Sequence, residues 1–321
     1  MSAGTAPATP VAAVPDRPLR RPRVACLGGG TGLSTILRAL KRHADVTAIV
    51  TTTDDGGSSG RLRRDLGMPA PGDLRSCLVA LADDESLMGR LFQHRFSTGE
   101  LAGHSFGNLF LAGLTELMGS FDRAVLESAR VLAVAGRVVP STTEVVELVA
   151  EFDDGHRVRG ETAIAADGGL CRRVELDPPA PRAHPRALGA LDRAQLIVLG
   201  PGSLFTSTLP SILVPGIRDA LREAAAPVVY VCNLLQQPGE TEGYRASEHV
   251  RRIVEHVGDG LIDYVLVSTN RTEQGTPVRV DRAELRRMGL TVVGGRLAGE
   301  WQHDPERLAR ALLRVARMEA R

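Results

Sequence analysis

Residues 24–33 read VACLGGGTGL: four apolar residues come before three glycines, a threonine and a fourth glycine. The apolar run predicts a buried strand, and apolar residues recur at helical spacing from Leu33 to Leu40. Glycines let a backbone approach a phosphate closely, and a helix start offers unpaired N–H groups and a positive dipole end. This strand, turn and helix therefore predict a phosphate-binding turn. The plain alternative is a tight turn without a ligand.

The same alternation of strand and helix continues along the chain. Residues 46–53 form a second apolar run, which predicts a strand parallel to the first through a right-handed crossover. Further strands are predicted at 195–199, 228–234, 262–267 and 291–293, with helical periodicity between them. We therefore predict an α/β domain over residues 23–321, Rossmann-like and doubly wound, with a mostly parallel sheet.

Two segments depart from this pattern. Residues 138–186, approximately, contain alternating apolar and polar residues around the turn Asp153-Asp154-Gly155, which predicts a β-rich insertion. Residues 1–22 are rich in Ala, Pro, Thr and Arg and lack the apolar stretch of a signal peptide, so we predict a disordered tail.

Bulk composition argues against several classes of protein. A formal net charge of +1 gives no indication of nucleic-acid binding. No apolar run approaches the roughly 20 residues that span a bilayer, so we predict no membrane span. The four cysteines are not spaced as a metal knuckle or a redox pair, which favours a reduced, cytoplasmic setting.

Residues 53–60 (TDDGGSSG) follow the second predicted strand and carry two carboxylates beside flexible backbone. Ligands of open α/β sheets bind at this end of the strands. Asp54 and Asp55 are candidates to hold magnesium, to accept a proton from a substrate hydroxyl, or to bind a ribose. The alternative is a mobile surface loop of small polar residues.

Two further loops precede apolar helices. In residues 71–75 (PGDLR), Asp73 is either a ligand-binding residue or a helix N-cap. In residues 104–108 (HSFGN), His104 is a candidate general acid, although a lone histidine is more often structural. Asn108 is better placed to reach a ligand from the first helical turn.

Residues 200–203 (GPGS) repeat the strand–glycine–helix arrangement, and both glycine loops should share one edge of the sheet. Asn233 follows a predicted strand and is a candidate to bind a base or a sugar, and Gln237 belongs either to a clamp or to a turn. The residues predicted to bind the ligand are Gly29, Gly30, Thr31, Gly32, Gly56, Gly57, Ser58, Asp73, Asn108, Gly200, Pro201, Gly202, Ser203, Asn233 and Gln237.

Taken in order, the motifs of this chain resemble those of the YvcK proteins, the gluconeogenesis factors that are relatives of the CofD transferases. They are LGGGTGL (27–33), TDDGGSSG (53–60), PGDLR (71–75), HSFGN (104–108), GPGS (200–203) and CNLLQQPGETEGY (232–244). The resemblance implies a Rossmann-like domain that binds UDP-sugars such as UDP-glucose and UDP-N-acetylglucosamine. It also implies links to cell shape, cell-wall synthesis with its protein partners, and growth on gluconeogenic carbon sources.

The resemblance also implies individual roles. A late tyrosine and an arginine near the last helix contact the nucleotide sugar in this family, and Tyr264 fills the first role. Gln302 stands where the arginine is usual, so Arg296 is the candidate substitute. CofD relatives transfer a phospholactyl group from a guanylated donor to a deazaflavin precursor with magnesium, and their acidic residue matches Asp54 or Asp55.

Three functions follow as hypotheses. The first is a UDP-sugar-binding regulator without turnover, whose ligand-dependent surface would be a mobile loop at 54–65. The second is a CofD-like transferase that acts on a nucleotide diphosphate donor, with Asp54 and Asp55 as catalytic residues and magnesium as its cofactor. The third is an NAD-dependent dehydrogenase, against which Leu33 counts because it replaces the third glycine of the dinucleotide fingerprint. Apart from magnesium in the second, no cofactor is predicted, and a homo-oligomer is left open.

Overall fold

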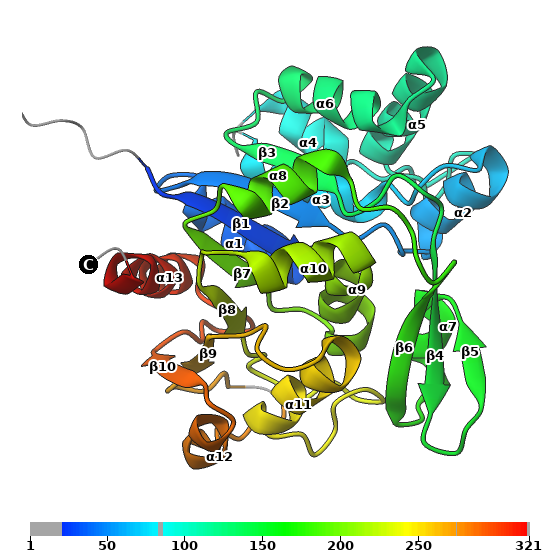
Figure 1. The fold of residues 1–321 in the computed structure, drawn as a ribbon. Helices are drawn as coiled ribbons and strands as arrows, with labels where there is room; N and C mark the ends of the chain where they lie inside the picture. The colour runs from blue at the N-terminus through cyan, green and yellow to red at the C-terminus, as the bar shows by residue number, and fades with distance from the viewer. Residues whose placement is uncertain (1–20, 83–85, 274, 320–321) are drawn as a thin grey trace, which may run out of the picture.

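The computed structural model describes residues 21–82, 86–273 and 275–319, so the tail predicted at 1–22 lies outside it apart from Arg21 and Pro22. Its main sheet has seven strands in the order β10-β9-β8-β7-β1-β2-β3 (Figure 1), and each pair of neighbours is parallel. The strands are β1 (Arg23–Gly28), β2 (Asp45–Val50), β3 (Arg137–Pro140), β7 (Leu196–Leu199), β8 (Val228–Val231), β9 (Tyr264–Ser268) and β10 (Thr291–Gly295). The predicted doubly wound fold is confirmed.

The strand order reverses between β1 and β7. From β1 the chain adds β2 and β3 on one side, and it then returns to place β7 beside β1 and continues outward through β8, β9 and β10. The connections that leave β1 and β7 therefore diverge at their carboxyl ends. In open α/β sheets this divergence creates the crevice in which ligands bind.

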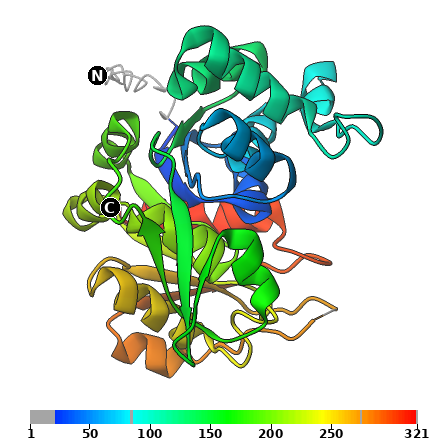
Figure 2. The same cartoon turned by 90° about the vertical axis from the view of Figure 1, so that its right-hand side faces the viewer.

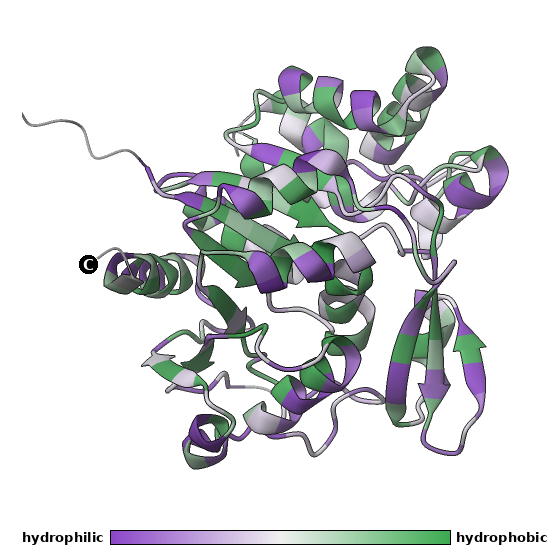
Figure 3. Cartoon of the chain, viewed as in Figure 1, coloured by the Kyte–Doolittle hydropathy of each residue, from purple (hydrophilic) through white to green (hydrophobic). Residues whose placement is uncertain are grey.

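Helices cover both faces of the sheet because successive strand residues point to opposite sides. Val24 and Cys26 of β1 belong to one apolar core, and Ala25 and Leu27 belong to the other. The first core contains α1 (Gly30–Leu40), α3 (Gly72–Leu81), α4 (Leu87–Gln93), α5 (Phe106–Met118), α6 (Phe121–Val131) and α13 (Pro305–Glu319). The second contains α8 (Pro185–Asp192), η1 (Leu204–Thr208), α9 (Leu209–Leu213), α10 (Pro215–Glu223), α11 (Ala246–Val257) and α12 (Arg282–Arg287). Figure 3 shows the central strands as mainly hydrophobic.

The insertion is a three-stranded antiparallel sheet of β4 (Glu147–Phe152), β5 (Arg157–Arg159) and β6 (Cys171–Asp177) with helix α7 (Glu161–Asp167). The hairpin turn predicted at residues 153–155 is confirmed, since β4 and β5 pair on either side of it. The predicted boundaries of 138–186 were too wide. β3 belongs to the main sheet because it pairs with β2. The apolar pattern of so short a strand does not show which sheet it joins. Figure 2 shows the insertion in front of the sheet edge where the strands end.

Two further observations bear on the predicted setting. Among the described residues, no helix has both the length and the apolar composition needed to cross a membrane. All four cysteines are buried and carry free thiols.

Candidate functional site

A cavity of about 360 Å³ lies where β1, β7 and β8 end. Its walls combine the two glycine loops, the segment after β8 and the loop before α13. The lining residues are Gly29, Thr31, Gly32, Thr35, Pro201, Gly202, Ser203, Ser207, Asn233, Leu234, Leu235, Gln237, Trp301, Gln302 and His303. The structure thus brings together both predicted phosphate loops, Asn233 and Gln237 at the switch point of the sheet.

The start of α1 supplies positive potential to this cavity. Gly29 is the N-cap residue and has no side chain to cap the helix, and the first turn of α1 contains no acidic residue, although the Gly30 N–H donates to Asp73 of α3. The first amides of such a helix have no partners within the helix, and its dipole places partial positive charge at the same end. Gly29, Thr31 and Gly32 line the cavity, so this end of α1 is suited to a phosphate.

Asn233 holds the second glycine loop in place. Its Oδ1 accepts a hydrogen bond from the Gly202 N–H at 3.2 Å, and its Nδ2 donates to the Gly202 carbonyl at 2.7 Å. The same Nδ2 also donates to Gln237 Oε1 at 3.1 Å. The role predicted for Asn233, to bind a base or a sugar, stays a prediction, and the contacts that the structure shows for its amide are with the protein.

The residues that follow this loop are held by a half-buried acid that the sequence did not indicate. Ser203 caps η1 by accepting from the Thr206 N–H at 2.9 Å, and its hydroxyl donates to Glu240. Glu240 Oε1 also accepts from the Phe205 N–H at 2.9 Å. Burial raises the pKa of Glu240. The partners lie 35 or more residues apart in sequence, so no local pattern could have identified this contact.

A group of acids, Asp54, Asp73 and Glu161, lies beside the first glycine loop and is called the acidic cluster below. Asp73 is not the N-cap of α3, because Pro71 occupies that position, and the cap interpretation is wrong. Its carboxylate accepts a hydrogen bond from the Gly30 N–H. Burial first, and then the charge of Asp54, raise the pKa of Asp73 from 3.8 to about 7.

Glu161 was missed because it comes from the insertion. It begins α7, accepts a hydrogen bond from the Thr53 hydroxyl, and has a pKa raised well above its usual value by burial and then by Asp73. Beside it, Asp55 Oδ1 accepts from the Thr162 N–H at 2.9 Å and from the Thr162 hydroxyl at 2.7 Å. These contacts tie the insertion to the loop that follows β2.

The loop predicted to be mobile at 54–65 is mostly helical, since α2 spans Gly57–Leu66. Gly56 is its N-cap residue, and Ser58 is buried with its hydroxyl 3.0 Å from His104 Nδ1. Asn108, also buried, donates from Nδ2 to Ser59 Oγ at 3.4 Å. Gly56, Gly57, Ser58 and Asn108 therefore flank the acidic cluster and do not line the cavity.

The acidic cluster does not fit a preformed magnesium site. No three His, Cys, Asp or Glu side chains within the described ranges are arranged to hold a metal ion. The carboxylates are instead engaged with the protein, since Asp54 Oδ1 accepts from the Gly56 N–H at 2.9 Å and Glu161 accepts from Thr53.

Two predicted contacts are not brought to this cavity. Tyr264 is the first residue of β9, so it lies at the amino ends of the strands, on the side of the sheet opposite to this cavity. There it lines a separate hollow of about 830 Å³. The resemblance assigned Tyr264 to the nucleotide sugar, and the parallel direction of the strands places it away from this cavity. Arg296 directly follows β10 at the correct edge, but it is exposed and does not line the cavity.

The residues before α13 were underestimated. Asp304 does start the helix, since its Oδ1 accepts from the Arg307 N–H at 2.9 Å. No sequence pattern predicted a ligand contact for Trp301 or His303, yet both line the cavity with Gln302. Only the fold shows that the chain turns back after β10 to reach the glycine loops.

Comparisons with known proteins agree with this arrangement. Residues 24–298 match the family model described as 2-phospho-L-lactate transferase CofD. The gluconeogenesis factor of Bacillus subtilis is 44% identical over 310 residues, covering 92% of this chain and 98% of that protein. The gluconeogenesis factor of Halalkalibacterium halodurans is 42% identical over 311 residues, covering 92% and 97%.

A solved structure shows the same fold. The crystal structure of a Bacillus halodurans protein, described as a member of the UPF0052 family, superposes with a TM-score of 0.89 at 42% identity. The superposition covers 92% of this chain and all of that one. From the family match and from identities above 40% over nearly full length, the chain belongs to the CofD family, in the group that contains the gluconeogenesis factors.

Proposed function

We propose that this protein binds a nucleotide sugar of the UDP-sugar class and acts as a regulator without turning its ligand over. The observation that carries the proposal is the cavity at the switch point. There the start of α1, where Thr31 and Gly32 line the cavity, and a second glycine loop, held by Asn233, face the same space. Backbone amides and a helix dipole stabilise the charges of a diphosphate without requiring a metal or a lysine.

The remaining walls suit the rest of such a ligand. Leu234, Leu235 and Trp301 give the cavity apolar surface, while Thr31 and Gln237 add polar groups. A mostly apolar pocket with a few placed polar groups is typical of small-molecule sites, and about 360 Å³ lies in their usual range.

The regulatory part of the proposal is supported by the relatives, two of which are named gluconeogenesis factors. We extend their role to this chain as control of growth on gluconeogenic carbon, of cell-wall synthesis through protein partners, and of cell shape. The insertion can transmit a ligand-dependent change to the protein surface, since the hydrogen bonds between Asp55 and Thr162 connect the ligand side of the domain to α7.

Calorimetric titration with UDP-glucose and UDP-N-acetylglucosamine tests the proposal, with GDP and NAD as competing classes. Thermal unfolding gives a second readout, because a ligand at 100 times its Kd stabilises the folded state by roughly 2.7 kcal/mol. We expect heat and a raised Tm with the UDP-sugars alone. Absence of both at millimolar concentration would refute the proposal.

A transferase is the second candidate, favoured by the CofD family match and by the acidic cluster beside the cavity. Prolonged incubation with UDP-sugar, with and without magnesium, separates the two functions. A product that accumulates with the wild-type chain and is absent with Asp55→Asn would establish turnover. Unchanged UDP-sugar after incubation supports the regulator.

A further inference from the structure

The loop Ala298–His303, called the 298–303 loop here, carries the last three lining residues into the cavity. Ala298 and His303 pair as an antiparallel bridge, and the Gly299 N–H donates to the Gln302 carbonyl at 2.8 Å. The loop is therefore closed on itself, with Trp301 near its tip. It is a short loop closed by backbone hydrogen bonds.

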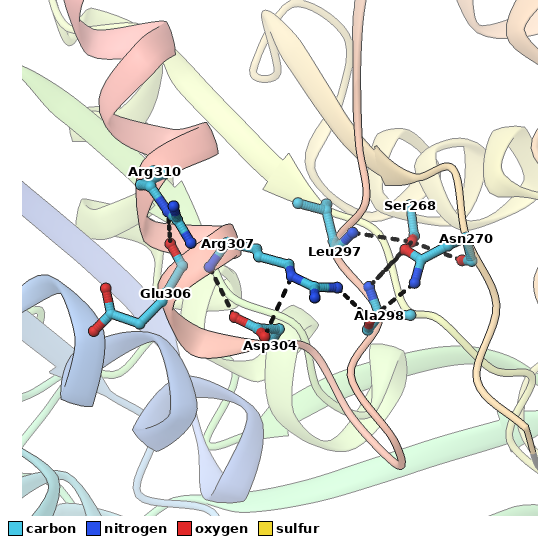
Figure 4. A network of polar contacts seen from close by, with 8 residues as sticks. All are labelled: Ser268, Asn270, Leu297, Ala298, Asp304, Glu306, Arg307 and Arg310. Atoms are coloured by element: carbon cyan, nitrogen blue, oxygen red, sulfur yellow. Dashed lines mark hydrogen bonds and ion pairs between the residues drawn. The ribbon is translucent and has the colours of Figure 1, made fainter.

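Polar contacts hold the 298–303 loop against the sheet (Figure 4). Asn270 binds Ala298 through both ends of its amide, since Nδ2 donates to the Ala298 carbonyl at 2.9 Å and Oδ1 accepts from its N–H at 3.1 Å. Ser268 Oγ accepts from the Leu297 N–H at 3.3 Å, and Arg307 donates to the Ala298 carbonyl at 3.4 Å. The base of the loop is thus held in place by the protein itself.

His303 presents an unused acceptor. Its side chain is only 6% exposed, and Nε2 is buried without a hydrogen-bond partner, although the residue lines the cavity. The ring is hydrogen-bonded to the backbone of Cys232, and because Nε2 is free, Nδ1 makes that bond. When Nδ1 donates to a carbonyl, the neutral ring keeps a lone pair on Nε2. Burial lowers the pKa of His303 to about 4, which supports the neutral ring.

An acceptor of this kind pairs only with a group that donates a hydrogen bond. Phosphate oxygens carry negative charge and have no proton to donate at neutral pH, so they do not pair with Nε2. An unpaired buried acceptor is costly, and a ligand N–H or O–H would satisfy it. The cavity wall therefore offers two unlike kinds of group, amides for a diphosphate at Gly29–Gly32 and an acceptor at His303.

Trp301, from the same loop as His303, adds an aromatic side chain to the cavity wall. It is the only tryptophan of the chain and is 58% exposed, although it lines a cavity. Large aromatic side chains are usually covered, and planar ligands stack on their faces with about 1–3 kcal/mol per base in nucleic-acid sites. Trp301 therefore offers the planar base of a nucleotide a surface to stack on.

We propose that the 298–303 loop recognises the nucleoside half of the ligand, with His303 accepting from a nucleoside N–H or O–H and Trp301 stacking on the base. This inference rests on the proposed function and goes beyond it. It assigns the nucleoside half of the ligand to one loop and makes Trp301 and His303, which flank Gln302, responsible for recognising it.

The single tryptophan makes the test direct. Intrinsic fluorescence reports on Trp301 alone, while calorimetry reports binding regardless of where it occurs. We expect UDP-glucose to change the fluorescence and inorganic pyrophosphate to leave it unchanged. Trp301→Ala should weaken UDP-glucose binding roughly tenfold, and Trp301→Phe should retain most of it. Leu117→Ala, at a residue 81% exposed on α5, is the control for handling and folding.

Analogues of UDP-glucose test His303 in the wild-type protein, so the result does not depend on a variant that folds. One analogue carries a methyl group on the base N3, and two others lack the 2′- or the 3′-hydroxyl. Loss of the donor that pairs with Nε2 should weaken binding tenfold or more. His303→Leu should abolish that difference, and His303→Gln should partly restore it because its amide supplies an acceptor.

The outcomes distinguish a failure of this inference from a failure of the proposed function. UDP-glucose binding that leaves fluorescence unchanged, or that is insensitive to all three analogues, overturns the inference and leaves the proposed function standing. No heat with any UDP-sugar overturns both. Binding with a fluorescence change and one sensitive analogue supports both.

Discussion

The carbonyl oxygen of Pro201 lies 1.8 Å from the position that a Cβ atom on Gly32 would occupy. The two glycine loops of the site therefore touch, backbone to backbone, and a hydrogen atom is the only side chain that fits between them. The requirement for glycine at position 32 comes from this contact and not from a left-handed φ angle, which Gly32 does not have.

Gly32→Ala should therefore push the two loops apart. The expected result is a loss of UDP-sugar affinity of at least tenfold together with destabilisation of about 1–3 kcal/mol, as for overpacking. Calorimetry and urea unfolding measure the two effects. Gly113→Ala is the matched control, because Gly113 lies within α5 with nothing within 4 Å of its added Cβ. There alanine should stabilise the helix by roughly 0.5–1 kcal/mol. Equal behaviour of the two variants would contradict the close contact.

Asn233→Ala should loosen the second glycine loop without touching the first. The variant loses the bonds to the Gly202 N–H and carbonyl at 3.2 and 2.7 Å. We expect affinity for inorganic pyrophosphate and for UDP-glucose to fall by similar factors, roughly tenfold, since Asn233 acts on the phosphate loop. A loss confined to UDP-glucose would show that Asn233 contacts the sugar or base after all.

The sequence was sufficient for the parts of this site that follow strands. The glycines at 28–32 and 200–202 each came after a buried apolar run, and parallel strands bring such loops to one edge. It was insufficient wherever a residue reaches the site from a distant element. Glu161 arrives from the insertion, Glu240 from a loop beyond β8, and His303 from a chain reversal after β10.

Two differences between expectation and structure had physical causes of a different kind. The small polar residues of 57–66 favoured a loop by composition, yet they form α2, closed by Gly67 in a left-handed conformation. Tyr264 was assigned by resemblance alone. The start and the end of a five-residue strand lie at opposite edges of the sheet, so a small error in alignment changes the edge.

Tyr264→Phe should leave UDP-sugar affinity unchanged within twofold, because the tyrosine lies at the amino end of β9. Arg296→Ala tests the other residue implied by the resemblance, and its exposed position at the correct edge predicts a modest loss of two- to threefold, as for a screened surface charge. Calorimetry on both variants measures how much each residue contributes to UDP-sugar affinity. A large loss with Tyr264→Phe would return that residue to the site.

Asp73 makes stability depend on pH in a predictable direction. Its pKa is raised to about 7 in the folded protein, against 3.8 in the unfolded chain. The folded state therefore holds a proton that the unfolded state releases, so stability falls as pH rises from about 4 to 7 and stays low above that. The Glu161 pKa is raised as well and contributes with the same sign.

Asp73→Asn should remove this dependence while keeping an oxygen that accepts from the Gly30 N–H. Urea unfolding at pH 5 and pH 8 should show the variant gaining stability over wild type at pH 8. That gain should exceed the one at pH 5 by on the order of 2 kcal/mol. Asp65→Asn, at an exposed position of α2, controls for the loss of one negative charge. A gain equal at both pH values would mean that the Asp73 carboxyl titrates at its ordinary pKa, and that the start of α1 faces a charged acid when it meets a phosphate.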